Sequence, residues 1–273
     1  MAQKQRLDAL LVARGLCPSR QAAQRSIRAG EVRVNEAVVD KPGTPIRPSA
    51  SIRLLAKPPY VSRGGEKLAR ALAAFAIPVP GRICLDAGIS TGGFTDCLLQ
   101  AGAARTYGID VGYGQVAWSL RQDERVVLCE RTNIRHLSPQ QLYGEAPRAD
   151  LGVADVSFVS LTKILAPLWQ LLVSPREAIV LVKPQFEVGK GYFARAASKG
   201  VVRDPDEHVR AIEGVLQAAQ GVGWQASGLT PSPRPGPAGN VEYLLWLRAR
   251  EPAALDGATI RAMVAGALAP EAR

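Results

Sequence analysis

The chain has 273 residues, 47% of them hydrophobic, which is enough to bury a sizeable core in one large or two smaller domains. No apolar run approaches the ~20 residues that a membrane helix needs, and the charged N-terminal stretch lacks the apolar segment of a signal peptide. These features argue against membrane insertion and secretion, and we expect a cytoplasmic protein. Four scattered cysteines and two histidines favour reduced, buried thiols over a metal site.

Positive charge is concentrated at the N-terminal end of the chain. Residues 1–59 hold 11 lysines and arginines against 4 acidic residues, whereas the remaining residues hold 23 against 20. This asymmetry indicates a module that binds a polyanion, joined to a nearly neutral body. The alternative is a basic surface that serves only solubility.

The basic segment is predicted to form two helices and then a small sheet. Leucines spaced for one helical face predict a helix over residues 5–15, and Ser19 is a suitable N-cap for a second helix over 20–29. Alternating apolar and polar residues predict short strands at 31–35, from 38 onward and at 51–55. Such a unit is too small to carry catalysis by itself.

Several spacings in this segment agree with one known domain. They include Arg6-Leu7-Asp8, Gly15-Leu16, Ser19-Arg20 and Val32-Arg33-Val34-Asn35. The segment 5–56 resembles the alpha-L RNA-binding domain, the type found in ribosomal small-subunit protein S-four. The resemblance implies that arginines on the second helix and the following turn contact RNA. The RNA-binding residues that it implies are Arg6, Arg20, Arg25, Arg28 and Arg33.

The tripeptide Lys57-Pro58-Pro59 can continue neither a helix nor a central strand, so we expect a linker there. The expected organisation is an RNA-binding domain over 1–57, a linker over 58–62, a larger domain over 63–250 and a tail over 251–273. One short helix is expected in the tail, around residues 260–264.

Strands and helices alternate through the larger domain, which predicts an α/β fold with a mostly parallel, doubly wound sheet. The predicted strands cover residues 82–86, 106–110, 126–129, 151–155, 178–182, 224–229 and 241–247. The predicted helices cover residues 66–75, 94–100, 161–172 and 204–220.

A glycine-rich loop follows the first of these strands, in the sequence Asp86-Ala87-Gly88-Ile89-Ser90-Thr91-Gly92-Gly93-Phe94. Glycines let a backbone turn tightly and approach a ligand, and ligands of open α/β sheets bind at this edge. Asp110 ends the second strand, where an acidic residue would hold ribose hydroxyls. The loop is neither a dinucleotide fingerprint nor a P-loop.

The loop resembles the first motif of class I (Rossmann-like) methyltransferases, in which it faces the methionine part of S-adenosylmethionine. Asn133, after the third strand, matches the adenine-contacting position of that family. The cofactor-binding residues that the resemblance implies are Asp86, Gly88, Ser90, Gly92, Gly93, Asp110 and Asn133.

Four charged residues are predicted to converge beside this loop. Asp155 and Lys183 each end an apolar strand, and a buried lysine is costly without a partner. Glu242 opens the last strand and reaches the same edge if that strand is inverted, while Lys67 lies on a helix that can cross the opening. The alternative is a set of unrelated surface ion pairs.

These four residues resemble the Lys-Asp-Lys-Glu tetrad of FtsJ-like 2′-O-methyltransferases, and the chain as a whole resembles the TlyA family, often labelled hemolysin A. The shared segments include residues 61–67, 110–115, 183–190, 200–205 and 235–242. The resemblance implies that a cytidine ribose 2′-hydroxyl in ribosomal RNA is methylated, with Lys183 as base or as the cation that steadies the alkoxide. The rival is a non-catalytic ribosome-assembly factor that binds RNA.

The segment 186–202 has little periodicity and carries Lys190, Arg195 and Lys199. We expect it to close over RNA, although an ordinary surface loop would have the same composition. Neither the methylated nucleotide nor the oligomeric state can be predicted from the sequence.

Overall fold

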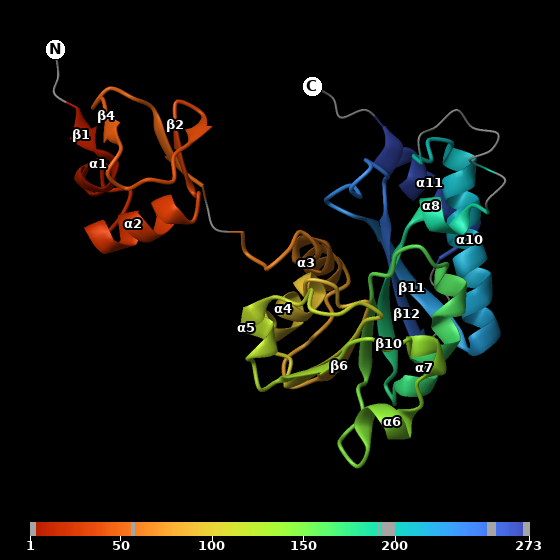
Figure 1. Cartoon of the computed structure of the whole chain (residues 1–273). Helices are drawn as coiled ribbons and strands as arrows, with labels where there is room; N and C mark the ends of the chain where they lie inside the picture. Colours follow the sequence, from red (N-terminus) through yellow and green to blue (C-terminus); the bar gives the residue numbers. More distant parts are fainter. Residues whose placement is uncertain (1–3, 56–57, 190–191, 193–199, 250–254, 270–273) are drawn as a thin grey trace. The chain divides into compact units, whose positions relative to one another are not determined.

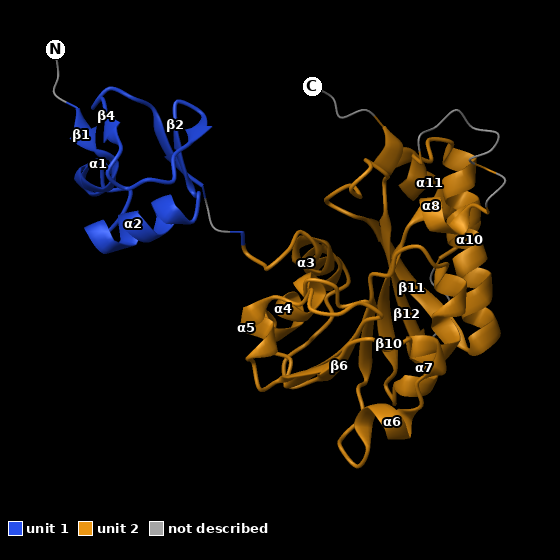
Figure 2. Cartoon of the chain, viewed as in Figure 1, with its two compact units in different colours: residues 1–58 blue, residues 59–273 orange. Residues whose placement is uncertain are grey.

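The computed structural model describes residues 4–55, 58–189, 192, 200–249 and 255–269. The chain divides into two compact units, residues 1–58 and 59–273, which are coloured separately in Figure 2. Figure 1 gives the element labels used below.

The first unit packs two helices against short strands. Helix α1 (Leu7–Ala13) and helix α2 (Arg20–Arg28) enclose an apolar core with β2 (Val32–Val34). Strand β2 pairs with β3 (Ala37–Val38) and β5 (Ile52–Leu54), and β1 (Gln5–Arg6) pairs with β4 (Pro45–Ile46). Ser19 caps α2 by accepting a hydrogen bond from the Ala22 N–H, as predicted.

The predicted first helix began too early. Gln5 and Arg6 are extended and pair with Ile46 and Pro45, so the helix begins only at Leu7. The spacing of the leucines describes only the helical part, and no pattern within residues 5–15 reveals the distant strand that pairs with its first residues.

The second unit is built on a seven-stranded sheet in the order β11-β12-β10-β9-β6-β7-β8. Neighbours from β8 to β10 are parallel, whereas β12 runs antiparallel to both β10 and β11. The strands are β6 (Ile83–Ala87), β7 (Arg105–Ile109), β8 (Val126–Cys129), β9 (Leu151–Ala154), β10 (Glu177–Val182), β11 (Trp224–Pro231) and β12 (Tyr243–Ala249).

Helices cover both faces of this sheet. On one face α3 (Gly64–Ala74) and α4 (Gly93–Gln100) pack on side chains such as Ile179 and Leu181. On the other face α7 (Leu165–Leu171), α10 (Pro205–Val222) and α11 (Gly257–Leu268) pack on side chains such as Val180 and Val182. Figure 1 shows both layers, and the alternation along β10 is that of a strand buried on both faces. The fold is therefore the predicted doubly wound α/β type.

Several elements differ from the prediction. Residues 161–172 form a 3-10 turn (Leu161–Lys163) followed by α7, with Pro167 in the first turn of α7, where no helical N–H is needed. Short helices α5 (Trp118–Arg121), α6 (Pro139–Tyr143) and α8 (Pro184–Glu187) were not predicted, because none spans a full amphipathic repeat. The tail helix α11 is longer than expected, and its buried Ile260 and Val264 belong to the main core.

Among the residues that the structure describes, no helix combines the length and the apolar character needed to cross a membrane. In the same residues, no three potential metal-binding side chains form a group. Cys17, Cys84 and Cys97 are buried, Cys129 is half-buried, and all four are free.

Candidate active site

The loop between β6 and α4 requires its glycines. Gly88 has a φ of +89°, and a Cβ there would lie 3.0 Å from the carbonyl oxygen of Asp155. Gly92 has a φ of +102°, and a Cβ there would lie 2.2 Å from Leu120. A Cβ added at Gly93 would lie 2.2 Å from the Ser62 hydroxyl oxygen. A side chain at any of these three positions would collide with its neighbours, so the loop can follow this path only with glycine there.

Asp110, predicted to hold ribose hydroxyls, is hydrogen-bonded to the backbone of the glycine-rich loop. Its Oδ2 accepts a hydrogen bond from the Ser90 N–H at 2.8 Å, and its Oδ1 accepts one from the Gly112 N–H at 2.7 Å. Asn133 is exposed, and its side-chain oxygen accepts from the Arg135 N–H as the cap of a 3-10 turn (Ile134–His136). Both side chains line the same cavity.

Asp86 lies beneath the loop and is fully buried. Its Oδ2 accepts a hydrogen bond from the Thr95 hydroxyl at 2.7 Å, while its Oδ1 has no partner among the residues that the structure describes. Burial raises the pKa of Asp86 to about 7, against the lowering effect of Thr95. Asp86 and Gly92 line neither cavity at this edge of the sheet, so their positions suit support of the loop.

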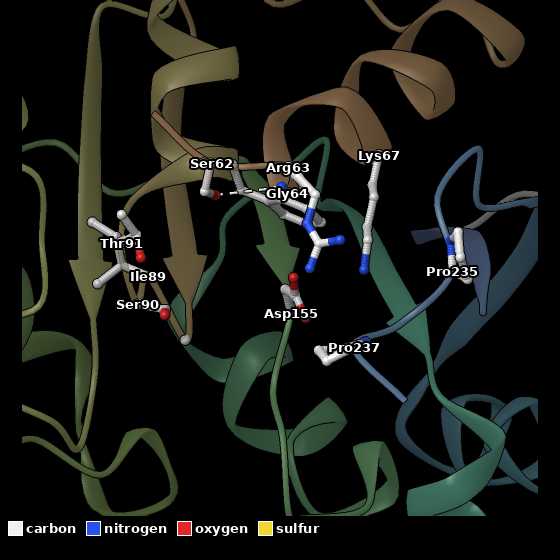
Figure 3. A pocket seen from close by; sticks show the side chains of 13 residues that line it. Ser62, Arg63, Gly64, Lys67, Ile89, Ser90, Thr91, Asp155, Pro235 and Pro237 are labelled. Carbon is white, nitrogen blue, oxygen red and sulfur yellow. Dashed lines mark hydrogen bonds between the residues drawn. The ribbon is translucent and has the colours of Figure 1, made fainter. Parts of the chain in front are cut away.

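Two cavities meet at the loop and share Gly88, Ser90 and Asp155 in their walls. The larger, of about 500 Å³, extends along Asp110 and Asn133 and has a mainly apolar lining that includes Ile134, Val156, Phe158 and Ile164. The smaller, of about 340 Å³, is shown in Figure 3 and reaches from the loop to Lys67 and the proline-rich segment 231–237. The two cavities therefore join at the glycine loop.

The four charged residues come together as two ion pairs. Lys67 Nζ lies 2.6 Å from Glu242 Oε2, and Lys183 Nζ lies 2.6 Å from Asp155 Oδ1. Lys67, Lys183 and Glu242 are buried, and Asp155 is partly exposed. Burial makes these pairs unlike surface ion pairs, because an isolated charge in their position would be strongly destabilising.

The inverted last strand explains how Glu242 reaches the cluster. In the antiparallel pairing of β10 and β12, Val182 lies opposite Tyr243. Lys183 follows the end of β10 and Glu242 precedes the start of β12, so the two residues meet at the same edge. Asp155 follows β9, which is parallel to β10 and ends at this edge as well.

Sequence reasoning missed several residues around the cluster. Lys183 also donates to Ser157 Oγ at 2.8 Å, and Gln185 donates to Glu242 Oε1 at 3.3 Å. Arg63 lines the smaller cavity beside Lys67. Ser157 and Gln185 each lie two residues from a predicted tetrad member, so the residues flanking each charged position were the available signal.

The segment expected to close over RNA is described only in part. Lys190, Arg195 and Lys199 lie outside the described residues. Its end is attached beside the cluster, because Asn240 donates to the Gly200 carbonyl oxygen at 3.0 Å and accepts from the Val202 N–H at 2.9 Å. Asn240 is two residues from Glu242 and is almost fully buried.

The five arginines predicted to bind RNA differ in their surroundings within the first unit. Arg6 and Arg20 reach Asp8 Oδ2 at 2.9 and 3.2 Å, and Asp8 is fully buried. Arg33 lies 3.9 Å from Glu36. Arg25 and Arg28 are exposed on α2, opposite the core residues Ala23 and Ile27, and make no ion pair with any residue in the described ranges.

Comparison with known proteins agrees with this architecture. Residues 60–249 match the FtsJ-like methyltransferase family, and residues 5–52 match the S4 domain. The chain is 49% identical to the 16S/23S rRNA (cytidine-2′-O)-methyltransferase TlyA of Mycobacterium tuberculosis over 94% of each protein. The chain belongs to the TlyA family of FtsJ-like methyltransferases.

Other members of the family carry a different label. Hemolysin A of Brachyspira hyodysenteriae is 38% identical over 88% of this chain and 98% of its own length. A solved structure from Streptococcus thermophilus, provisionally described as a hemolysin, is 39% identical with a TM-score of 0.73, covering 98% of this chain and 96% of that one. The methyltransferase fold and the hemolysin label therefore occur in one family.

Proposed function

We propose that this protein transfers a methyl group from S-adenosylmethionine to the 2′-hydroxyl of a cytidine in ribosomal RNA. The observation that carries the proposal is the pair of buried ion pairs, Lys183–Asp155 and Lys67–Glu242, beside a glycine loop and two joined cavities. The relatives named for this activity on ribosomal RNA support the choice of substrate. A cytoplasmic location, where ribosomal subunits are available, belongs to the same proposal.

The residues present suit S-adenosylmethionine. The mainly apolar cavity along Asp110 and Asn133 offers room for a nucleoside, and Asp110 can accept further hydrogen bonds from ribose hydroxyls. The glycine loop lines both cavities through Gly88 and Ser90, so its backbone can approach the remainder of the molecule. S-adenosylmethionine supplies a sulfonium methyl group, whose bond to sulfur breaks with the electron pair retained by sulfur.

The chain's own residues place and activate the ribose hydroxyl. Lys183 first passes one proton to solvent, and its neutral Nζ then accepts the 2′-hydroxyl proton as the oxygen forms its bond to the methyl carbon. Asp155 and Ser157 hold that nitrogen in position, at 2.6 and 2.8 Å. Lys67, held by Glu242 beneath it, lines the smaller cavity together with Asp155 and adds positive charge near the developing alkoxide. Because the methyl group is already activated, in-line positioning supplies much of the rate.

Substitutions of Lys183 test the proposal. Lys183→Ala should lower methyl transfer from radiolabelled S-adenosylmethionine to ribosomal RNA by about 10²–10⁴-fold, the range for loss of a general base. Lys183→Arg should be similarly poor, because arginine keeps the charge but does not deprotonate in proteins. Calorimetry with S-adenosylhomocysteine should give nearly unchanged affinity for both variants.

The outcomes separate the candidate roles. If arginine restores most of the rate, Lys183 acts as an electrostatic stabiliser and not as a base. If alanine retains near-normal turnover, the tetrad assignment is wrong. A wild-type protein that binds ribosomal RNA but transfers no methyl group would favour the non-catalytic ribosome-assembly factor. Mapping 2′-O-methyl groups in both ribosomal RNAs, with and without the protein, identifies the nucleotide.

A further inference from the structure

The smaller cavity contains a cation that the tetrad does not explain. Each carboxylate of the cluster is already paired with one lysine, Asp155 with Lys183 and Glu242 with Lys67. The neighbouring Glu66 is paired with Arg234 at 2.6 Å. Arg63 is exposed, lines the cavity and makes no hydrogen bond or ion pair with any residue within the described ranges. Its guanidinium is therefore a surplus positive charge facing open space.

The backbone directs Arg63 into the same cavity as Lys67. Arg63 is the N-cap of α3 and has helical dihedral angles, with φ −58° and ψ −19°. Lys67 is four residues further along, and residues at this spacing lie on one face of a helix. Figure 3 shows the two side chains side by side, with Asp155 beyond them.

We propose that Arg63 binds the phosphodiester group on the 3′ side of the ribose that becomes methylated. The inference rests on the proposed function, which places the ribose at Lys183. In RNA the 3′-phosphate is attached to the carbon next to the one that carries the 2′-hydroxyl. Lys183 is paired with Asp155, which lines the cavity, so a ribose that reaches Lys183 past Asp155 brings this phosphate to the mouth of the cavity. A guanidinium can bind the phosphate through two parallel hydrogen bonds.

The pairing would also assist the reaction. A phosphodiester carries a negative charge next to the oxygen on which negative charge develops, so an unpaired phosphate opposes ionisation of the hydroxyl. A guanidinium fixed on the phosphate offsets this repulsion in the transition state. Lys183 would then act on the hydroxyl and Arg63 on its neighbouring anion.

The carboxylate of the cofactor is the other source of an oxyanion. In Figure 3, Ile89, Ser90 and Thr91 lie on the side of the cavity away from the guanidinium of Arg63, which points toward Asp155. The cofactor would be held at the loop, whereas Arg63 lies with the residues assigned to the ribose. The geometry therefore favours the phosphate.

The kinetics of Arg63→Gln test the assignment. Arg70→Gln is the matched control, because Arg70 is exposed on the same helix and does not line the cavity. Arg63→Gln should lower kcat/KM for ribosomal RNA by about 10- to 100-fold, the effect of losing a charged hydrogen bond. Arg63→Lys should fall between Arg63→Gln and the wild type. The Kd of S-adenosylhomocysteine should not change, and Arg70→Gln should behave as the wild type.

A modified RNA sharpens the test once the target nucleotide is mapped. A neutral methylphosphonate on its 3′ side should lower kcat/KM of the wild type, which loses the charged contact. Arg63→Gln should lose nothing further and should gain rate, because the charge of its unpaired phosphate is removed. Additive effects, or an Arg63→Gln rate equal to that of Arg70→Gln, would overturn the assignment. If Arg63→Gln binds S-adenosylhomocysteine more weakly but has an unchanged KM for RNA, the Arg63 guanidinium binds the carboxylate of the cofactor and not the phosphate. A wild type without methyl transfer would remove the proposed function, and this inference with it.

Discussion

At the scale of single residues, the site depends on charges that are buried in pairs, Lys183 with Asp155 and Lys67 with Glu242. Lys183 and Asp155 could be singled out because each follows an apolar strand, where a charge is costly without a partner. The structure joins them directly at 2.6 Å and leaves Lys67 with Glu242. Pairing depends on side-chain reach and on Ser157, which is too ordinary a residue to stand out in a sequence.

Asp86 gives a pH-dependent prediction. Burial raises its pKa to about 7, above the usual value of 3.8. At pH values below 3.8, both folded and unfolded chains hold this proton. As the pH rises toward 7, only the unfolded chain releases it, so the stability associated with the protonated group is progressively lost.

Asp86→Asn should remove this dependence, because the amide oxygen can still accept from Thr95. We expect the free energy of unfolding of the wild type to fall relative to the variant by up to about 1.4 kcal/mol per pH unit between about pH 4 and 7. Denaturant titrations of both proteins without ligand measure the difference. A difference that stays constant across this range would contradict the raised pKa.

At the scale of elements, the order of strands and helices could be predicted, whereas the loops that complete the site could not. Alternating β and α segments predict the sheet, and only the inversion of β12 places Glu242 beside Lys183. The proline-rich segment 231–237 carried no pattern that could be interpreted. The structure places Gly236 against Glu242 and binds the Gly236 N–H to the Asn240 carbonyl oxygen at 2.9 Å.

Gly236→Ala should therefore impair catalysis without unfolding the protein. A Cβ at Gly236 would lie 2.5 Å from Glu242 Oε1, and the end of that side chain can move away. Movement of the carboxylate would release Lys67 from its 2.6 Å contact. Because a misplacement of about 1 Å can cost about 10²-fold in rate, we expect a clear fall in kcat.

Gly214→Ala is the control, since nothing lies within 4 Å of a Cβ there and the residue is inside helix α10. Gly236→Ala should remain folded but melt below the wild type, because the buried Lys67–Glu242 pair is loosened, whereas Gly214→Ala should melt at or slightly above the wild type. S-adenosylhomocysteine affinity should be close to wild type for both variants. Equal kcat values for the two would show that Gly236 does not position Glu242.

At the scale of the whole molecule, the excess positive charge and the candidate active site lie in different units. The first holds most of the excess positive charge, and the second holds both ion pairs and both cavities. This separation could be predicted from composition, because a charge count needs no fold. Composition could not predict which arginines are available to a ligand, because two of them, Arg6 and Arg20, form ion pairs with the buried Asp8.

Two double variants of equal charge test that distinction. Arg25→Ala with Arg28→Ala removes two exposed arginines that have no ion pair within the described residues. It should weaken binding to ribosomal RNA and reduce the slope of log affinity against log salt by about 0.7–0.9 for each phosphate that the protein no longer neutralises. Arg6→Ala with Arg20→Ala removes the two cationic partners of Asp8 and leaves it only the neutral hydrogen bonds from Gln24 and the Ala9 N–H. The side-chain hydrogen bond from Arg6 is the main cause that lowers the pKa of Asp8.

The second pair should act mainly on stability. Asp8 is fully buried, so removal of both arginines leaves its charge uncompensated, and the stability that it contributes above its unfolded pKa is lost. Hydrogen–deuterium exchange in α1 and α2 of the full chain should accelerate for this pair and stay unchanged for Arg25→Ala with Arg28→Ala. If both double variants reduce the salt slope equally and neither changes hydrogen–deuterium exchange, the contact with Asp8 does not distinguish Arg6 and Arg20 from Arg25 and Arg28. All four arginines would then contribute equally to RNA binding.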